Sequence, residues 1–203
     1  SSKTSVSSRE VQGGDSTGVG ESTLSSKMID KRQDFALVIL SDGRSLSIGG
    51  RGATTSFGFN PQYNATTEVY DPVADKWTLS GAMDNWRSVP SAVELKDGKV
   101  LVSGGGASKR NSTSLTEIWD PGTGEWTIVA SMNQPREKFA LIRLEDGRVI
   151  AIGGSDSEGQ HTQTAEVYDP AADTWTLIDP MGDIYYPPAR ARSPYYSFKL
   201  LPH

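Results

Sequence analysis

The sequence predicts an all-β fold made of three copies of one four-stranded unit. The same landmarks recur in the same order in each copy, and the tryptophans that begin the last strand, Trp77, Trp126 and Trp175, are spaced 49 residues apart. The 21 glycines, 11 prolines and hydrophobic fraction of 35% suit short strands joined by turns. No long stretch shows the 3.6-residue apolar period of an amphipathic helix, so we expect no long helices.

The first half of each unit is predicted to be a β-hairpin. A methionine and an arginine four residues later precede an apolar strand, and an Asp-Gly pair follows that strand. Asp-Gly supplies the positive φ angles of a tight hairpin turn, so the next strand should pair antiparallel with the first. In the three units the strand and its turn are Phe35–Leu40 with Asp42-Gly43, Pro90–Leu95 with Asp97-Gly98, and Phe139–Leu144 with Asp146-Gly147.

The second half of each unit adds two more strands. The second strand ends in a Gly-Gly pair, where the backbone must pass close to a neighbour or twist sharply. After a polar loop, a third strand carries Glu-Val-Tyr or Glu-Ile-Trp, Asp-Pro marks a turn, and a fourth strand begins at the tryptophan. A period near 50 with four short strands per unit is typical of a β-propeller, in which each unit forms one blade.

This ordered set of landmarks resembles the kelch repeat, and the resemblance covers about residues 28–181. Trp119 stands where the repeat usually has tyrosine, and Pro90 replaces an aromatic residue of the first strand. The resemblance implies a ring of four-stranded antiparallel blades. We therefore expect an all-β, kelch-type β-propeller with three full four-stranded blades plus the first strand of a fourth.

The chain divides into a leader and a propeller segment. Residues 1–27 are rich in Ser, Gly and Thr and bury too little apolar surface to offset their ordering entropy, so we predict a flexible leader. The propeller segment spans 28–203, with blades at about 28–82, 83–131 and 132–180 and a partial fourth at 181–203, where Tyr195–Leu201 matches a first strand. Known propellers have about four to eight blades, which favours part of a longer propeller. The alternative is a half-ring that self-associates, because two sets of three blades make six.

Function is expected on the variable connections between strands two and three and between strands four and one. Both kinds of connection share one end of the blades, whereas the near-identical Asp-Gly and Asp-Pro turns share the other. Aromatic and basic residues on exposed loops are the types that anchor protein interfaces. The candidate partner-binding residues are Arg51, Phe57, Phe59, Tyr63, Trp86, Lys109, Arg110, His161, Tyr185, Tyr186 and Arg190. For the aromatic residues, the alternative is that they fold back over a blade edge.

The residues that repeat are interpreted as packing residues. A buried aromatic side chain is the expected filling between stacked sheets, which applies to Trp77, Trp126, Trp175, Tyr70 and Tyr168. The repeated arginines have two interpretations: hydrogen bonds to the backbone near the blade ends, or a ring of guanidinium groups near the central channel that meets an anionic ligand. These arginines are Arg32, Arg87 and Arg136.

Charge and composition exclude some partners. The net charge is −5 without a dominant basic patch, so nucleic acid is not an expected partner. No run approaches the roughly 18–20 apolar residues of a membrane span. Two sequons, at Asn64 and Asn111, are candidate glycosylation sites and would fit a secreted protein, although chance supplies about one in so Ser- and Thr-rich a chain. The compartment stays open between extracellular and cytoplasmic, with the sequons favouring the former.

Catalysis is not expected from these residues. Galactose oxidase, a copper enzyme that some kelch-containing proteins resemble, needs a tyrosyl–cysteine cross-link and histidine ligands. This chain has no cysteine, and His161 and His203 are its only histidines. The Asp156–His161 segment is interpreted as a solvated polar loop rather than a metal site. We therefore predict no enzymatic activity, no metal site and no cofactor.

Three functional hypotheses follow from the sequence. The leading one is a protein-interaction scaffold that binds a partner protein through variable loops on one propeller face. The second is a non-catalytic β-domain of a larger extracellular carbohydrate-binding or galactose-oxidase-like protein, which makes a glycan the alternative ligand. The third is a structural assembly subunit that pairs through its open blade edges.

Overall fold

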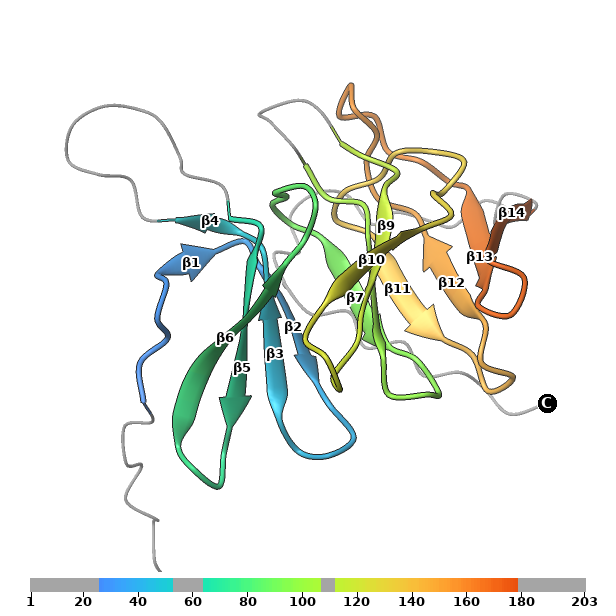
Figure 1. Cartoon of the computed structure of the whole chain (residues 1–203). Coiled ribbons are helices and arrows are strands. Elements are labelled where there is room, and N and C mark those ends of the chain that lie inside the picture. The colour runs from blue at the N-terminus through green and yellow to red at the C-terminus, as the bar shows by residue number, and fades with distance from the viewer. Residues whose placement is uncertain (1–25, 53–63, 107–111, 179–203) are drawn as a thin grey trace, which may run out of the picture.

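Three four-stranded antiparallel sheets stand side by side in the chain (Figure 1). The structure, a computed structural model, describes residues 26–52, 64–106 and 112–178. Each sheet is one blade, which confirms the predicted all-β propeller architecture. The predicted leader, apart from Ser26 and Lys27, and the whole of the predicted partial fourth blade lie outside the described residues.

Each blade is a simple meander whose strands pair in chain order. Blade 1 consists of β2 (Ala36–Ile39), β3 (Ser45–Ile48), β5 (Thr66–Asp71) and β6 (Lys76–Ala82). Blade 2 consists of β7 (Ser91–Glu94), β8 (Val100–Ser103), β9 (Thr116–Trp119) and β10 (Trp126–Val129). Blade 3 consists of β11 (Ala140–Arg143), β12 (Val149–Ile152), β13 (Ala165–Asp169) and β14 (Thr174–Ile178). The first strands lie next to one another, with β7 between β2 and β11.

The two ends of the blades differ. The short turns between strands one and two and between strands three and four lie at one end, which we call the turn face (Figure 1). The connections between strands two and three and between strands four and one lie at the other end, which we call the loop face. On the loop face of blade 1, β1 (Arg32–Gln33) pairs with β4 (Arg51–Gly52) in a short two-stranded ribbon. Single bridges take the place of this ribbon in blades 2 and 3, between Ser88 and Gly106 and between Glu137 and Ser155.

The Asp-Gly turns differ in detail from the predicted tight turn. The amide of Gly43 donates to the carbonyl of Leu40 over 2.9 Å, and the amide of Leu40 donates to the carbonyl of Arg44 over 2.8 Å. Gly43 has a φ of 90°, and Asp42 is not among the residues with positive φ. The turn is therefore a four-residue turn closed by a left-handed glycine, and the expectation of positive φ angles at both positions of the pair was wrong.

In two of these turns, hydrogen bonds to the aspartates, Asp42 and Asp146, favour the ionised form. The Oδ1 atoms of Asp42 and Asp146 accept backbone N–H groups of Arg44 and Arg148 at 2.9 and 3.0 Å, and their Oδ2 atoms accept the guanidinium groups of the same arginines. The pKa of Asp42 is lowered from 3.8 mainly by the side-chain bond from Arg44. The pKa of Asp146 is lowered from 3.8 mainly by the backbone bond from Arg148.

We predict that acid destabilises the fold partly through these turns. Because the folded-state pKa values lie below 3.8, their contribution is fully present above that value and is lost as the pH falls through the lowered values. The urea midpoint should therefore fall between pH 7 and about pH 2.5, and the fall should be smaller in a variant that combines Asp42→Asn with Asp146→Asn. An equal fall in the variant and the wild type would contradict this account.

The Gly-Gly pairs allow neighbouring blades to approach. The amide of Gly50 in blade 1 donates to the carbonyl of Arg87 in blade 2 over 2.9 Å, and Gly105 donates to Arg136 over 2.8 Å. A Cβ atom on Gly49 would lie 2.7 Å from the Arg87 carbonyl oxygen, which no larger residue tolerates without a backbone shift. The pair is thus required by the close approach of the next blade, as the sequence predicted.

The hydrophobic cores lie between blades. One cluster joins blade 1 (Ala36, Val38, Leu40, Leu46, Ile48 and Val69) to Val100, Val102 and Trp119 of blade 2. A second, equivalent cluster joins Leu95 and Leu101 of blade 2 to Val149, Ala151, Tyr168 and Trp175 of blade 3. The aromatic residues therefore fill the space between stacked sheets as expected, although Trp77 and Trp126 are only half-buried.

A non-glycine residue with positive φ precedes the first strand of every blade. Asp34, Val89 and Lys138 have φ values of 55°, 52° and 56°. Aspartate tolerates this conformation, but a β-branched residue such as Val89 adopts it only under strain. The amide of Val89 donates to the carbonyl of Asp34 over 2.7 Å, so the contact with the previous blade fixes this backbone.

We predict that Val89→Gly is more stable than Val89→Ala by about 1 kcal/mol. Both substitutions remove the side chain, but only glycine accepts a positive φ without cost. In an ordinary backbone conformation alanine would be the more stable of the two. Urea denaturation of the two variants measures the difference, and a greater stability of Val89→Ala would show that the position is not strained.

Candidate interaction surface

A buried arginine–glutamate pair organises the loop face of each blade. In blade 3, Nη2 of Arg136 lies 2.9 Å from Oε1 of Glu166, and both side chains are fully buried. Nη1 of Arg136 also donates to the carbonyls of Gly153 and Thr164 at 3.1 and 3.0 Å. The guanidinium group therefore ties the end of β12 to the start of β13. The equivalent pairs are Arg32 with Glu68 in blade 1 and Arg87 with Glu117 in blade 2.

The carboxylate of each pair holds the connection from the preceding blade. Glu166 accepts the backbone N–H groups of Asn133 and Gln134 at 2.6 and 3.1 Å. In blade 2, Glu117 accepts the N–H of Asp84 at 2.9 Å. Both kinds of connection on the loop face are therefore fixed by one buried ion pair whose polar atoms are largely satisfied.

These contacts decide between the two interpretations of the repeated arginines. Arg32, Arg87 and Arg136 bind backbone carbonyls and their side chains are buried, so they do not form a ring of exposed cations. Burial lowers the pKa of Arg87, and the charge of Glu117 opposes that effect. The glutamates were not identified from the sequence as partners of the arginines.

We predict that Glu166→Gln lowers the free energy of unfolding by about 3–5 kcal/mol, because it leaves the guanidinium of Arg136 buried without a counter-charge. The matched control is Asp120→Asn, which removes a surface pair with Lys99 and should have a much smaller effect, because solvent screens that pair. Urea denaturation measures both. Equal effects of the two substitutions would show that the buried pair is not a principal constraint.

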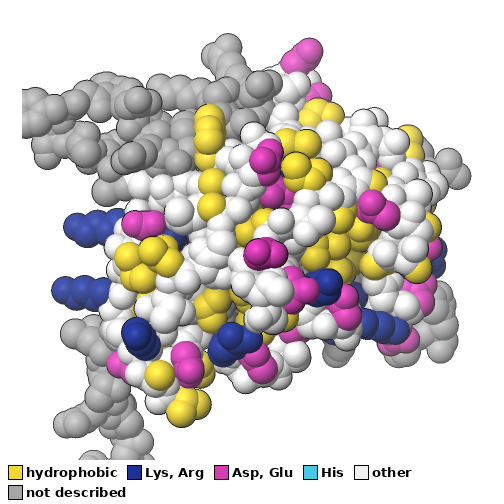
Figure 2. Space-filling view, in the orientation of Figure 1, with side chains coloured by type: hydrophobic (Ala, Val, Ile, Leu, Met, Phe, Trp, Pro, Cys, Tyr) yellow, Lys and Arg dark blue, Asp and Glu magenta, His cyan; other side chains and the backbone are white. Residues whose placement is uncertain are grey.

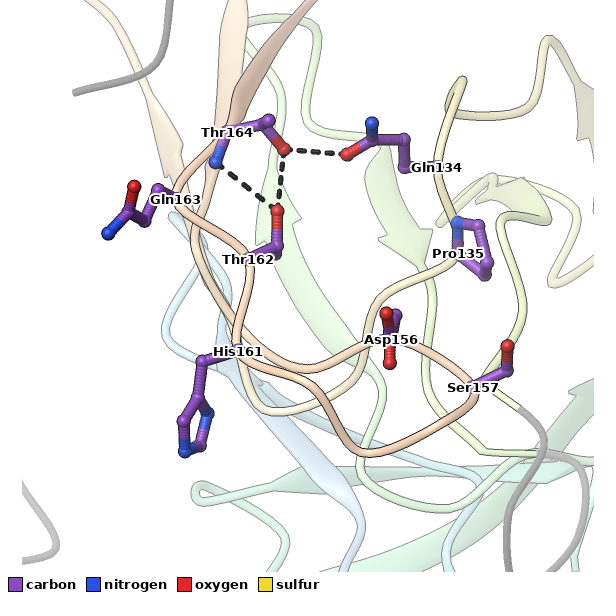
Figure 3. A pocket seen from close by; sticks show the side chains of 8 residues that line it. All are labelled: Gln134, Pro135, Asp156, Ser157, His161, Thr162, Gln163 and Thr164. Carbon is purple, nitrogen blue, oxygen red and sulfur yellow. Dashed lines mark hydrogen bonds between the residues drawn. The ribbon is translucent and has the colours of Figure 1, made fainter.

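A polar cavity of about 560 Å³ opens on the loop face of blade 3. Its walls come from the connection that enters the blade, at Gln134 and Pro135, and from the loop between β12 and β13. Figure 3 shows the side chains that line it. The residues of that loop that line it are Asp156, Ser157, His161, Thr162, Gln163 and Thr164.

The upper wall of the cavity is a hydrogen-bonded row built on the buried pair (Figure 3). Oγ1 of Thr164 accepts from Nη2 of Arg136 at 2.8 Å and donates to Oε1 of Gln134 at 2.6 Å. Thr162 lies 2.8 Å from Thr164, oxygen to oxygen. The amide side chain of Gln134 is therefore oriented by the same network that holds the blade together.

The remaining wall is a short turn. Oδ1 of Asp156 accepts the backbone N–H groups of Glu158 and Gln160 at 2.9 and 2.8 Å. His161 follows the turn and is exposed, with Nδ1 3.4 Å from Oγ of Ser155, and its ring points away from the centre of the cavity in Figure 3. The segment interpreted as a solvated polar loop is thus an ordered turn at the edge of a cavity.

The described candidate residues lie on three different blades. Arg51, on blade 1, pairs through its guanidinium with Asp34. Trp86, in the connection that enters blade 2, is 39% exposed. His161 belongs to blade 3, and the sequon residue Asn64 is half-buried and donates its backbone N–H to the Gly50 carbonyl at 2.9 Å.

The other candidates lie outside the described residues: Phe57, Phe59, Tyr63, Lys109, Arg110, Tyr185, Tyr186, Arg190 and the sequon residue Asn111. The sequence did point to the two connections that build the cavity, because they do not repeat, but it singled out only His161 among the lining residues. No motif in the sequence singles out Gln134, Thr162 or Thr164.

The face of the molecule drawn in Figure 2 shows no large area with charges of one sign only. On the face drawn in Figure 2, acidic and basic side chains are interspersed with hydrophobic ones. Among the described residues no group of three or more His, Cys, Asp or Glu side chains could hold a metal ion. Within the same ranges there is no helix long and apolar enough to cross a membrane.

Comparisons with known proteins agree with the repeats. A family model for the kelch motif matches residues 85–133 and 146–182, in the second and third units. No curated protein matches the chain. The solved structure of YjhT matches with a TM-score of 0.63 and 17% identity, over 75% of this chain and 53% of that one, so the chain spans about half its length. At this identity the likeness shows the fold alone. The kelch-motif match, the three repeated blades and this shared fold identify the chain as a kelch-repeat β-propeller.

Proposed function

We propose that the chain is a non-catalytic scaffold that binds a partner protein through its loop face. Kelch-repeat domains commonly bind proteins, and this general property supports the proposal. The observation that carries it is the cavity of blade 3, because it is built from the connections that differ between blades. Function in repeat folds usually lies on such variable connections.

The chemistry of the cavity favours a neutral, polar group of the partner. The Asp156 Oδ1 atom already accepts two backbone N–H groups, while Gln134 and Gln163 carry side-chain amides that offer both donors and acceptors. Gln134 is held by Thr164, so little rotamer freedom is lost on binding. A backbone amide or an Asn, Gln, Ser or Thr side chain of the partner would match these groups.

An apolar anchor is available on the neighbouring blade. Trp86 is 39% exposed on the same loop face, in the connection that enters blade 2. Tryptophan and arginine are enriched among residues that dominate binding energies. We therefore assign the interface to the loop face as a whole, with Trp86 as anchor and the blade 3 cavity as the polar recognition site; the candidates outside the described residues remain predictions.

The proposal is tested with peptides selected from a random-sequence display library on the wild-type chain. Ser157→Tyr should fill the cavity and weaken the selected peptides at least about tenfold, and Trp86→Ala should weaken them similarly, which corresponds to about 1.4 kcal/mol or more. Direct titration by calorimetry measures the change. Both variants should keep the wild-type melting temperature, since Trp86 and Ser157 are not buried.

The matched control is Val73→Tyr, which adds the same side chain on the turn face, where Val73 is 96% exposed. It should leave peptide binding unchanged. Peptides that bind the Ser157→Tyr and Trp86→Ala variants with the same affinity as the wild type would contradict the loop-face assignment. So would peptides that no longer bind the Val73→Tyr variant. Binding to an immobilised glycan panel, with no peptide selected, would instead favour the carbohydrate-binding alternative.

A further inference from the structure

The three Asp-Gly turns of the turn face have the same backbone but not the same side-chain contacts. In each turn, the backbone N–H of the residue after the glycine donates to Oδ1 of the aspartate. In blades 1 and 3 that residue is an arginine, whose Nε atom donates to Oδ2 of Asp42 and Asp146 at 2.8 and 2.7 Å. In blade 2 it is Lys99, so the aspartate of this turn, Asp97, is held differently.

Asp97 lacks the side-chain contact that its two equivalents have. The Nζ atom of Lys99 lies 3.1 Å from Oδ2 of Asp120, on the other turn of the same blade. Within the ranges that the structure describes, Oδ2 of Asp97 accepts no hydrogen bond. The carboxylate of Asp97 is therefore held through Oδ1 alone, by the backbone N–H of Lys99.

The backbone hydrogen bonds of this turn are also the longest of the three. The distance from the Lys99 nitrogen to Oδ1 of Asp97 is 3.2 Å, compared with 2.9 and 3.0 Å in blades 1 and 3. The N–H of Gly98 donates to the carbonyl of Leu95 at 3.2 Å, compared with 2.9 and 3.0 Å for the other two glycines. Both bonds must break before the Asp97 carboxyl group can reach the Gly98 nitrogen.

The turn of blade 2 has room for that movement. Asp97 is exposed, and a Cβ atom placed on Gly98 would have no atom within 4 Å other than those of its chain neighbours. A Cβ atom placed on Gly147 in blade 3 would lie 3.0 Å from Cδ of Lys96. The glycine of blade 1 is as open as Gly98, so the arginine contact is what distinguishes Asp42 from Asp97.

We propose that Asp97 is the residue of the three Asp-Gly pairs that converts to isoaspartate in the folded chain. The nitrogen of Gly98, which no side chain shields, attacks Cγ of Asp97 while the carboxyl group is protonated. A C–N bond forms, and the hydroxyl group of the acid leaves with the amide proton as one water molecule. The succinimide then takes up one water molecule. Opening at the main-chain carbonyl gives isoaspartate, and opening at Cγ restores aspartate.

Asp42 and Asp146 are protected from this reaction in two ways. Each must first release the guanidinium group that binds its Oδ2 atom. The hydrogen bonds to these aspartates also lower their pKa values below 3.8, so the protonated form that reacts is rarer at neutral pH. Neither protection depends on the residues of the loop face.

The product changes the hairpin between β7 and β8. Isoaspartate adds one carbon atom to the main chain of a turn that is closed by the hydrogen bond from the Leu95 amide to the Lys99 carbonyl, at 2.7 Å. This hairpin includes the first strand of blade 2, which lies between the first strands of its two neighbours. The modification lies on the turn face, so it is independent of partner binding by the loop face.

Storage of the full 203-residue chain at neutral pH and physiological temperature over several weeks tests the proposal. Chymotrypsin cuts after the leucine that precedes each pair, and electron-transfer fragmentation distinguishes isoaspartate from aspartate in the peptides. Isoaspartate should form about fivefold faster at Asp97 than at Asp42 or Asp146, a ratio equivalent to one hydrogen bond. In urea that unfolds the chain, the three rates should be similar, because glycine follows every one of these aspartates.

Two reciprocal substitutions are the matched controls. Lys99→Arg should slow the reaction at Asp97 to the rate of the other turns, because arginine makes the missing contact with Oδ2. Arg44→Lys should raise the rate at Asp42 towards that of Asp97. Equal rates at the three turns of the folded chain would overturn the proposal. So would an unchanged rate at Asp97 in Lys99→Arg, or a preference for Asp97 that is equally large in urea.

Discussion

The buried arginine–glutamate pair is the constraint on which the loop face depends. At this end of each blade the strands stop pairing, and backbone carbonyls would otherwise be left without donors. The guanidinium of Arg136 satisfies the carbonyls of Gly153 and Thr164, and the carboxylate of Glu166 satisfies the amides of Asn133 and Gln134. Desolvating two charges is costly, and the extra hydrogen bonds are what offset that cost. The loops can then vary in sequence because their ends are held by residues that do not vary.

The fold could be predicted because its signals are local and repeated. Asp-Gly turns, Gly-Gly pairs and Asp-Pro turns each mark one structural event, and the 49-residue spacing of the tryptophans links them into blades. The partner of each arginine was harder to predict from the sequence. Arg136 and Glu166 are 30 residues apart, and one lies in a connection while the other lies in a strand. The repeated glutamates were visible in the sequence, but their position beside Val-Tyr led only to a strand assignment. A repeated acid and a repeated base in a scaffold should have suggested a buried pair.

The cavity could not have been predicted from the sequence of either segment that lines it. Gln134 lies in the connection that enters blade 3 and Thr164 lies at the end of the β12–β13 loop, and they meet only because the buried pair fixes both segments. Sequence reasoning selects His161 for its residue type, yet its ring points away from the cavity centre (Figure 3). What identifies the site is the place where two non-repeating connections converge.

The molecule has two kinds of surface, the blade faces and the loop face, which differ in composition and in what they can bind. Blade faces are apolar and repeat, so they recognise another blade; the loop face is polar and does not repeat, so it recognises something else. Packing between blade faces does not cover the variable connections of the loop face, because they stand at the blade ends (Figure 1).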